Sequence, residues 1–166
     1  MLMLRCMLPV EMKSIIPTIS LVAMHNVLKS LAVLFLLIPF TSSQARVYLV
    51  SVGISDYPSS SMDLTLPVND AKTISWLYSK NTSVVKEQLL NENATVNNIV
   101  ASMNRVFAQA SGDDIVVLFF SGHGYPGGFV AYDGKMAYSK VRKAMATSKC
   151  KNKMIFADAC YSGKIR

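Results

Sequence analysis

The stretch DDIVVLFFSGHGYPGG (residues 113–128) decides the fold, because it contains the most strongly apolar run of the sequence. Its β-branched and aromatic residues from Ile115 to Phe120 predict a strand buried on both faces, as is typical of a parallel sheet. The glycines that follow also match the pattern G-x-G-x-x-G of dinucleotide-binding loops. The stretch therefore predicts either a phosphate-binding turn or a histidine, His123, held where the strand ends.

The glycine pattern does not meet the other requirements of a dinucleotide site. Such a site needs a helix that begins at the glycines and an acidic residue about 20 positions later. Here Gly127 and Gly128 lead into the strand-like segment FVAY, and residues 143–150 (KAMATSKC) contain no carboxylate. A P-loop is excluded as well, because Met136 stands where Ser or Thr is required. The match is incidental, and His123 is the feature that needs an explanation.

Strand and helix patterns alternate along the rest of the domain. Further strands are predicted at 46–54, 83–90 and 153–159. Helices are predicted from Asn69 to about Lys80, from a Thr95 cap to Phe107, and from about 139 to 148. Residues 127–138 predict a hairpin with Asp133-Gly134 as its turn. This alternation predicts one α/β domain, a three-layer α/β/α sandwich with a mostly parallel sheet.

Residues 1–45 have the pattern of a leader with a signal peptide. The apolar run from Leu31 to Phe40 has the length of a signal-peptide core and is shorter than the ~20 residues that a membrane span needs. Small residues before Arg46 suit a signal peptidase. We expect a mature domain of residues 46–166, exported to the periplasm or the outside, with no stable membrane span after cleavage. The alternative is an N-terminal helix that packs on the domain or remains as an anchor.

The chain is basic, with a formal net charge of +7, of which about +5 belongs to the domain that begins at Arg46. Much of the excess lies between Lys135 and Lys153. Apart from Tyr138 this stretch lacks the interleaved aromatic residues that stack on bases. It favours a solvated helix face over a nucleic-acid site, so we expect no nucleic-acid partner.

Cys160 follows the predicted strand 153–159, as His123 follows its own strand. Adjacent parallel strands would bring both residues to the edge where open α/β sheets bind ligands. A cysteine and a histidine in that place suit nucleophilic attack on a carbonyl group. The histidine and two cysteines of the domain form no recognisable metal-ligand set. The alternatives for Cys160 are a small buried hydrophobic residue or a disulfide with Cys150.

Four motifs resemble, in the same order, those of the caspase-like cysteine peptidases, in particular metacaspases and their bacterial relatives. The resemblance covers residues 46 to about 163. It implies that Cys160 is the nucleophile, that His123 is its partner, and that the backbone amides of Gly124 and Cys160 form the oxyanion hole. The motifs are VYLVSVGISDYP (47–58), LPVNDA (66–71), FFSGHG (119–124) and DACYSG (158–163).

The resemblance also implies a substrate class. Asp70, Ser121 and Asp158 match members of the metacaspase S1 pocket, and two carboxylates there favour cleavage of a peptide or protein after Arg or Lys. No organic cofactor is implied. Many metacaspases need calcium, but their calcium-binding aspartates have no match here. No metal ligand is therefore assigned, and a calcium requirement stays open.

The sequence departs from the metacaspase pattern in three places. Pro67 and Tyr161 stand where cysteine and histidine are common, and neither change removes a catalytic group. The sequence also stops at Arg166, soon after the nucleophile, whereas family members continue through further strands. We therefore expect a C-terminally truncated catalytic portion whose remainder is missing. An inactive caspase-like fragment or interaction module is the alternative, and another acyl transfer by the same two residues is a third reading.

Overall fold

The computed structural model describes residues 24–26, 28–30, 44–81 and 83–165. The chain divides into two compact units, Met1–Ser43 and Gln44–Arg166. In the first unit the described residues are helical and exposed. The apolar run of the predicted signal peptide lies outside the described residues, so the leader stays a prediction. No helix in the described part of the chain has the length and hydropathy that crossing a membrane requires.

The second unit is built on a four-stranded parallel sheet of order β2-β1-β3-β7. The two central strands, β1 and β3, are buried along almost their whole length. Burial on both faces explains why each is a continuous apolar run rather than an alternating one. The strands are β1 (Val47–Gly53), β2 (Val84–Leu90), β3 (Ile115–Ser121) and β7 (Asn152–Asp158).

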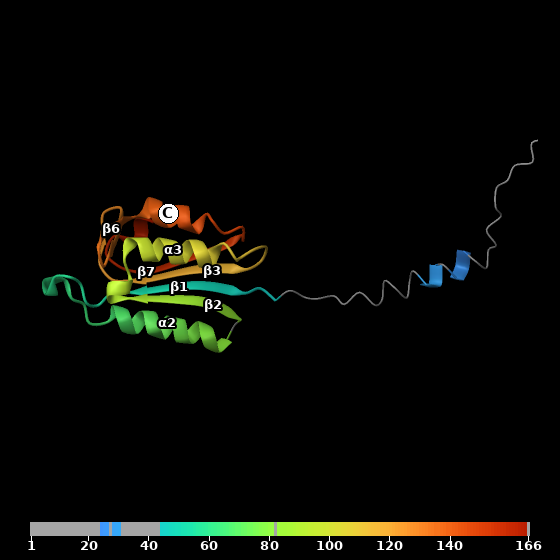
Figure 1. Ribbon diagram of the computed structural model, residues 1–166, viewed down its shortest axis with the longest axis horizontal. Helices are drawn as coiled ribbons and strands as arrows, with labels where there is room; N and C mark the ends of the chain where they lie inside the picture. The colour runs from blue at the N-terminus through green and yellow to red at the C-terminus, as the bar shows by residue number, and fades with distance from the viewer. Residues whose placement is uncertain (1–23, 27, 31–43, 82, 166) are drawn as a thin grey trace, which may run out of the picture. The chain divides into compact units, whose positions relative to one another are not determined.

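Helices cover both faces of this sheet (Figure 1). On one face Leu49 of β1 packs in a core with Ala71 of α2, and on the other Val50 packs in a core with Phe107 of α3. The predicted three-layer α/β/α arrangement with a mostly parallel sheet is confirmed. The helices are α2 (Pro67–Asn81), α3 (Val96–Phe107) and α4 (Tyr138–Met145), and short 3-10 turns lie at η1 (Ser60–Met62), η2 (Asn91–Asn93) and η3 (Ser162–Lys164).

The helix starts follow local chemistry. Thr95 caps α3 as predicted, since its Oγ1 accepts a hydrogen bond of 3.2 Å from the backbone N–H of Asn98. Helix α2 begins at Pro67, two residues before the predicted start, because a proline suits the first turn, where an N–H has no helical partner. Gly53 makes room for this start, since a Cβ there would collide with the Pro67 carbonyl oxygen. The first turn of α2 therefore lies against the end of β1.

A small antiparallel sheet follows β3, at the end of the main sheet where its strands finish (Figure 1). The predicted hairpin is present, but its turn is displaced by one residue. Ala131 pairs with Gly134, so that Tyr132 and Asp133 form the turn. Gly134 has φ of 140°, which favours glycine. The strands of this sheet are β4 (Gly124–Tyr125), β5 (Gly128–Ala131) and β6 (Gly134–Ala137).

Strand β7 lies at one edge of the main sheet and carries exposed apolar side chains. Met154 and Phe156 are each 46% exposed. Within the described residues, β7 pairs with β3 on one side only. An edge of this kind can pair with another extended segment.

Candidate active site

The turns after β3 and β7 bring His123 and Cys160 to the same edge of the sheet. Ser121 and Asp158 are the last paired residues of the two strands. His123 and Cys160 each stand two positions further along the chain. A backbone hydrogen bond of 3.1 Å from the N–H of Gly122 to the carbonyl of Asp158 extends the strand contact into the turns. The two residues therefore leave adjacent strands side by side.

Gly124 allows the two turns to approach each other. A Cβ at this position would collide with the carbonyl oxygen of Cys160 and lie 3.2 Å from its backbone nitrogen. No residue larger than glycine fits without a shift of the backbone. The backbone of Gly124 thus packs directly against the backbone of Cys160, the two residues whose amides the resemblance assigns to an oxyanion hole.

His123 is held from two sides. Its Nε2 lies 2.8 Å from the carbonyl oxygen of Met62, in the loop before α2. Its backbone N–H donates to the hydroxyl of Tyr57 at 3.0 Å, and its carbonyl accepts from the N–H of Val130 at 2.8 Å. The rings of Tyr57 and His123 also pack with their centroids 5.0 Å apart. The loop before α2 and strand β5 together fix the histidine.

The contact with Met62 selects a tautomer of His123. A carbonyl oxygen can only accept a hydrogen bond, so Nε2 of the neutral ring carries the hydrogen. Nδ1 then carries the lone pair. His123 therefore has one nitrogen available to accept a proton, which is the requirement for a general base.

Cys160 and Cys150 are both free thiols, so the disulfide alternative is not found. Cys150 is buried, and its thiol donates to the carbonyl oxygen of Asn152 at 3.2 Å. Cys160 is exposed, which excludes a buried hydrophobic role for it. Within the described residues no hydrogen bond joins the Cys160 thiol to the His123 ring. Catalytic hydrogen bonds are often long in the absence of substrate and tighten when it binds.

A pocket of about 440 Å³ opens at this edge, and its lining includes both His123 and Cys160. All three residues expected in the S1 pocket, Asp70, Ser121 and Asp158, line the same pocket. No lysine or arginine does so. The structure therefore brings every predicted site side chain into one cavity that carries two carboxylates.

Ser121 lies between the two acidic residues of the pocket, Asp70 and Asp158, and contacts the first through its side chain. Its Oγ donates to Oδ2 of Asp70 at 3.1 Å, and its strand position is opposite Asp158. Asp70 belongs to the first turn of α2, where the partial positive charge of a helix N-terminus stabilises an anion. The arrangement presents two negative groups to a side chain that enters the pocket.

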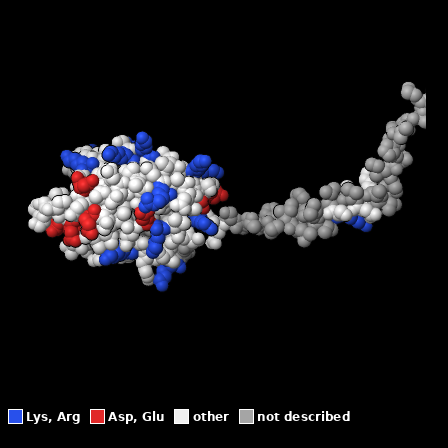
Figure 2. Space-filling view, viewed as in Figure 1, with Lys and Arg blue, Asp and Glu red and all other residues white. Residues whose placement is uncertain are grey.

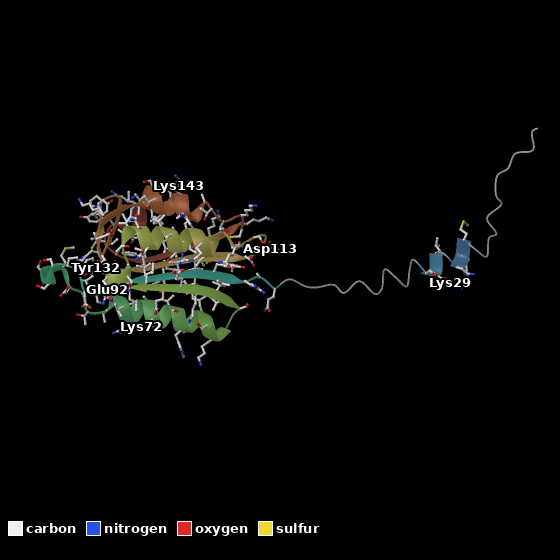
Figure 3. The ribbon with its side chains drawn as sticks, viewed as in Figure 1. Lys29, Lys72, Glu92, Asp113, Tyr132 and Lys143 are labelled. Carbon is white, nitrogen blue, oxygen red and sulfur yellow. The ribbon has the colours of Figure 1, made fainter. Side chains whose placement is uncertain are left out.

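Further negative charges lie near the pocket. Exposed carboxylates lie in the loops after the strands, at Asp56, Asp63, Glu92 and Asp133. Figure 2 shows several acidic side chains close together at this end of the domain, while lysines and arginines are spread over the visible face. In Figure 3, Glu92 lies at this end and Asp113 at the opposite end. A field of this kind attracts cationic ligands.

Sequence reasoning missed three contributors to the site: the hydroxyls of Tyr57 and Tyr138 and the carbonyl of Met62. Tyr57 lies in the quoted motif SDYP, so its position was visible but its role was not. Tyr138 donates to the carbonyl oxygen of Tyr161, the residue after the candidate nucleophile, at 3.0 Å. The Met62 carbonyl carries no side-chain signal at all.

No set of three or more His, Cys, Asp or Glu in the described part of the chain is placed to hold a metal ion.

Comparisons with known proteins agree with this architecture. A family model described as the caspase domain matches residues 46–166. No curated protein matches the chain significantly. Among solved structures, the chain is similar to the crystal structure of a structural-genomics target from Geobacter sulfurreducens, with a TM-score of 0.58 and 17% identity. The match covers 72% of this chain and 52% of that one, so this chain spans about half the length of the protein it resembles. At this identity the likeness concerns the fold.

Proposed function

Since the chain belongs to the caspase-domain family of cysteine peptidases, we propose that it is a metacaspase-like cysteine endopeptidase in which Cys160 is the nucleophile and His123 the general base. One observation carries the proposal. Both residues leave adjacent parallel strands at the same offset and line one pocket of about 440 Å³. Acyl transfer by covalent catalysis requires at least a nucleophile and a base that line the same cavity.

The geometry of His123 defines the proton transfers. Its Nδ1 accepts the thiol proton while the sulfur of Cys160 bonds to the peptide carbonyl carbon. The carbonyl oxygen becomes an oxyanion, which the backbone N–H groups of Gly124 and Cys160 stabilise. The C–N bond then breaks, and the imidazolium gives its proton to the leaving amine. Water, deprotonated by His123, attacks the thioester and releases the acid and the Cys160 thiol.

The Met62 carbonyl contacts Nε2, the ring nitrogen of His123 that does not take part in these proton transfers. It accepts the Nε2 hydrogen in the neutral ring, and it stabilises the imidazolium that forms after the first proton transfer. Because this contact occupies Nε2, Nδ1 is the ring nitrogen left to accept the thiol proton. Met62 can be replaced without loss of this contact, since only its backbone takes part.

The two carboxylates of the pocket favour an arginine or lysine side chain on the substrate. Asp70 and Asp158 can both pair with a guanidinium or ammonium group, and Ser121 adds a hydroxyl beside them. An aspartate side chain would meet like charges and be rejected. Peptides and proteins with exposed basic residues are the expected substrates.

A second candidate function is a caspase-like interaction module without turnover. The exposed edge of β7, with Met154 and Phe156, favours it, because this edge offers a pairing surface beside the candidate nucleophile. Amide transfer to an acceptor other than water is a third outcome that the same two residues allow.

The test is hydrolysis of fluorogenic peptides that end in Arg, Lys or Asp by the full chain, with and without calcium. We expect turnover of the Arg and Lys peptides and none of the Asp peptide. Cys160→Ala should abolish the turnover. A folded chain that hydrolyses none of the three peptides would favour the interaction module, and release of a transfer product alone would favour acyl transfer.

We also propose that the protein is exported. The second compact unit begins at Gln44, next to the cleavage position expected before Arg46. N-terminal sequencing of the protein from the extracellular or periplasmic fraction should give Arg46 as the first residue. A full-length N-terminus in the cell pellet would contradict the proposal.

A further inference from the structure

Two buried tyrosine hydroxyls fix the two turns that carry His123 and Cys160. Tyr57 is 7% exposed and Tyr138 is 3% exposed. The Tyr57 hydroxyl bonds to the backbone of His123 itself, and the Tyr138 hydroxyl bonds to the backbone of Tyr161, the residue after Cys160. Their roles are equivalent although they lie in unrelated parts of the chain.

The hydroxyl of Tyr57 is inserted into a β-ladder. His123 continues the antiparallel register of β4 and β5, in which it faces Val130. Such a pair normally exchanges two direct backbone hydrogen bonds. One is direct here, from Val130 N–H to His123 O at 2.8 Å. The other is relayed, because the Tyr57 hydroxyl accepts from His123 N–H at 3.0 Å and donates to Val130 O at 3.2 Å.

The surroundings of Tyr57 are adapted to this insertion. Gly122 leaves room for the hydroxyl, since a Cβ there would lie 2.8 Å from it. The backbone N–H of Tyr57 donates to Asp63 at 2.9 Å, next to the Met62 carbonyl that holds the His123 ring. One loop therefore grips both the backbone and the ring of His123.

Tyr138 performs the corresponding task at the other turn. Its hydroxyl donates to the carbonyl oxygen of Tyr161 at 3.0 Å. Tyr161 has φ of 62°, a left-handed conformation that non-glycine residues seldom adopt. The Tyr138 ring packs edge-on against Phe129, 5.0 Å away, and Phe129 precedes Val130 in β5. Strand β5 is thus the common support of both tyrosines.

We propose that Tyr57 and Tyr138 are positioning residues that set His123 and Cys160 at a reactive separation, with β5 as the rigid element between them. The inference rests on the proposed function, because it concerns the same pair. Burial raises the pKa of both hydroxyls above the ordinary value of 10.0. Both groups therefore keep their hydrogens, and the bonds to Val130 and Tyr161 persist at neutral and mildly alkaline pH.

The test compares Tyr57→Phe and Tyr138→Phe with Tyr48→Phe in the full chain. Tyr48 is also buried, but it lies near the amino end of β1, away from the carboxyl ends of the strands where the pocket opens. Four quantities are measured: kcat and KM for an Arg peptide, the pH profile of Cys160 alkylation by iodoacetamide, and Tm. Gly122→Ala, which crowds the Tyr57 hydroxyl but keeps the tyrosine, is the second variant if Tyr57→Phe does not fold.

Loss of either hydroxyl should lower kcat by about 10- to 100-fold, the range expected for a displacement of up to 1 Å, with KM changed less than about twofold. The alkylation of Cys160 should become slower across the profile, because a displaced His123 no longer accepts the thiol proton. Tyr48→Phe should leave kcat and the alkylation profile unchanged, whatever its Tm. A purely structural role predicts a lower Tm with normal kcat for the folded fraction, and that result would overturn the proposal.

The alkylation profile separates this inference from the proposed function. If the wild-type chain hydrolyses no peptide, the proposed function fails, and the profiles still decide whether the hydroxyls control Cys160. If the wild-type chain is active and the Tyr57→Phe and Tyr138→Phe profiles overlay the wild-type profile, the positioning role alone is refuted.

Discussion

Gly124→Ala tests the close approach of the two catalytic turns. The added Cβ would collide with the carbonyl oxygen of Cys160, with the carbonyl carbon at 3.0 Å and the backbone nitrogen at 3.2 Å. All three atoms are backbone, so no side-chain rotation relieves the collision. The turns after β3 and β7 must separate by about 1 Å, a displacement that reduces reaction rates on the order of 100-fold. Overpacking of this kind also lowers the free energy of unfolding by about 1–3 kcal/mol.

Gly163→Ala is the matched control for this prediction. Gly163 lies three residues after Cys160, and a Cβ there would have no neighbour within 4 Å. We expect its kcat/KM for an Arg peptide and its Tm to equal those of the wild type. Steady-state hydrolysis and thermal unfolding of the two variants provide the assay. Equal activity of the two alanine variants would refute the argument that the backbones of Gly124 and Cys160 must touch.

Three further predictions concern substrate selection, helix capping and alkaline stability. Asp70→Asn should lower kcat/KM for Arg peptides about tenfold or more, since a hydrogen bond to a charged group contributes about 1.5–3 kcal/mol. Asp158 is exposed, so Asp158→Ala should lower kcat/KM by only roughly two- to fivefold. Unchanged kinetics in both variants would exclude the pocket as the specificity site. Thr95→Ala should lower the free energy of unfolding in urea by about 1 kcal/mol, because it removes the cap of α3. A change below about 0.2 kcal/mol would show that the cap is dispensable. Burial raises the pKa of Tyr57 above 10.0 in the folded state, so its contribution to stability is complete below pH 10 and is lost as the pH rises through the folded-state pKa. In Tyr57→Phe the free energy of unfolding should therefore fall less steeply with pH above pH 10 than in the wild type. An equal decrease in the two proteins would contradict this.

The sequence predicted the parts of the fold that depend on local pattern. The apolar run of β3 and the capping threonine of α3 identify their elements without tertiary information, because burial on both faces and a side-chain cap leave direct marks on the residue types. The pairing of His123 with Cys160 at one edge followed from topology alone. Once β3 and β7 are adjacent and parallel, residues at equal offsets beyond their ends meet.

The contacts that hold His123 and Cys160 in place could not be predicted from the sequence, because they depend on loop conformation. The Met62 carbonyl reaches His123 from a loop in which the Asp63 side chain accepts a hydrogen bond from the Tyr57 N–H. Any residue type supplies the same carbonyl, so no residue pattern marks it. The sequence also did not predict the two-residue strand β4 or the one-residue shift of the hairpin turn. Both are set by strand pairing in the small sheet rather than by local propensity.

Covalent capture of the nucleophile shows whether Cys160 is the reactive residue and whether the pocket selects an arginine side chain. The full chain is treated with an arginine-based chloromethyl ketone and with its aspartate counterpart, and the labelled residue is located by mass spectrometry of proteolytic peptides. We expect rapid labelling of Cys160 by the arginine reagent, little labelling by the aspartate reagent, and slower labelling in His123→Ala. Labelling of a folded chain at Cys150, or equal labelling of Cys160 by both reagents with or without His123, would contradict this expectation.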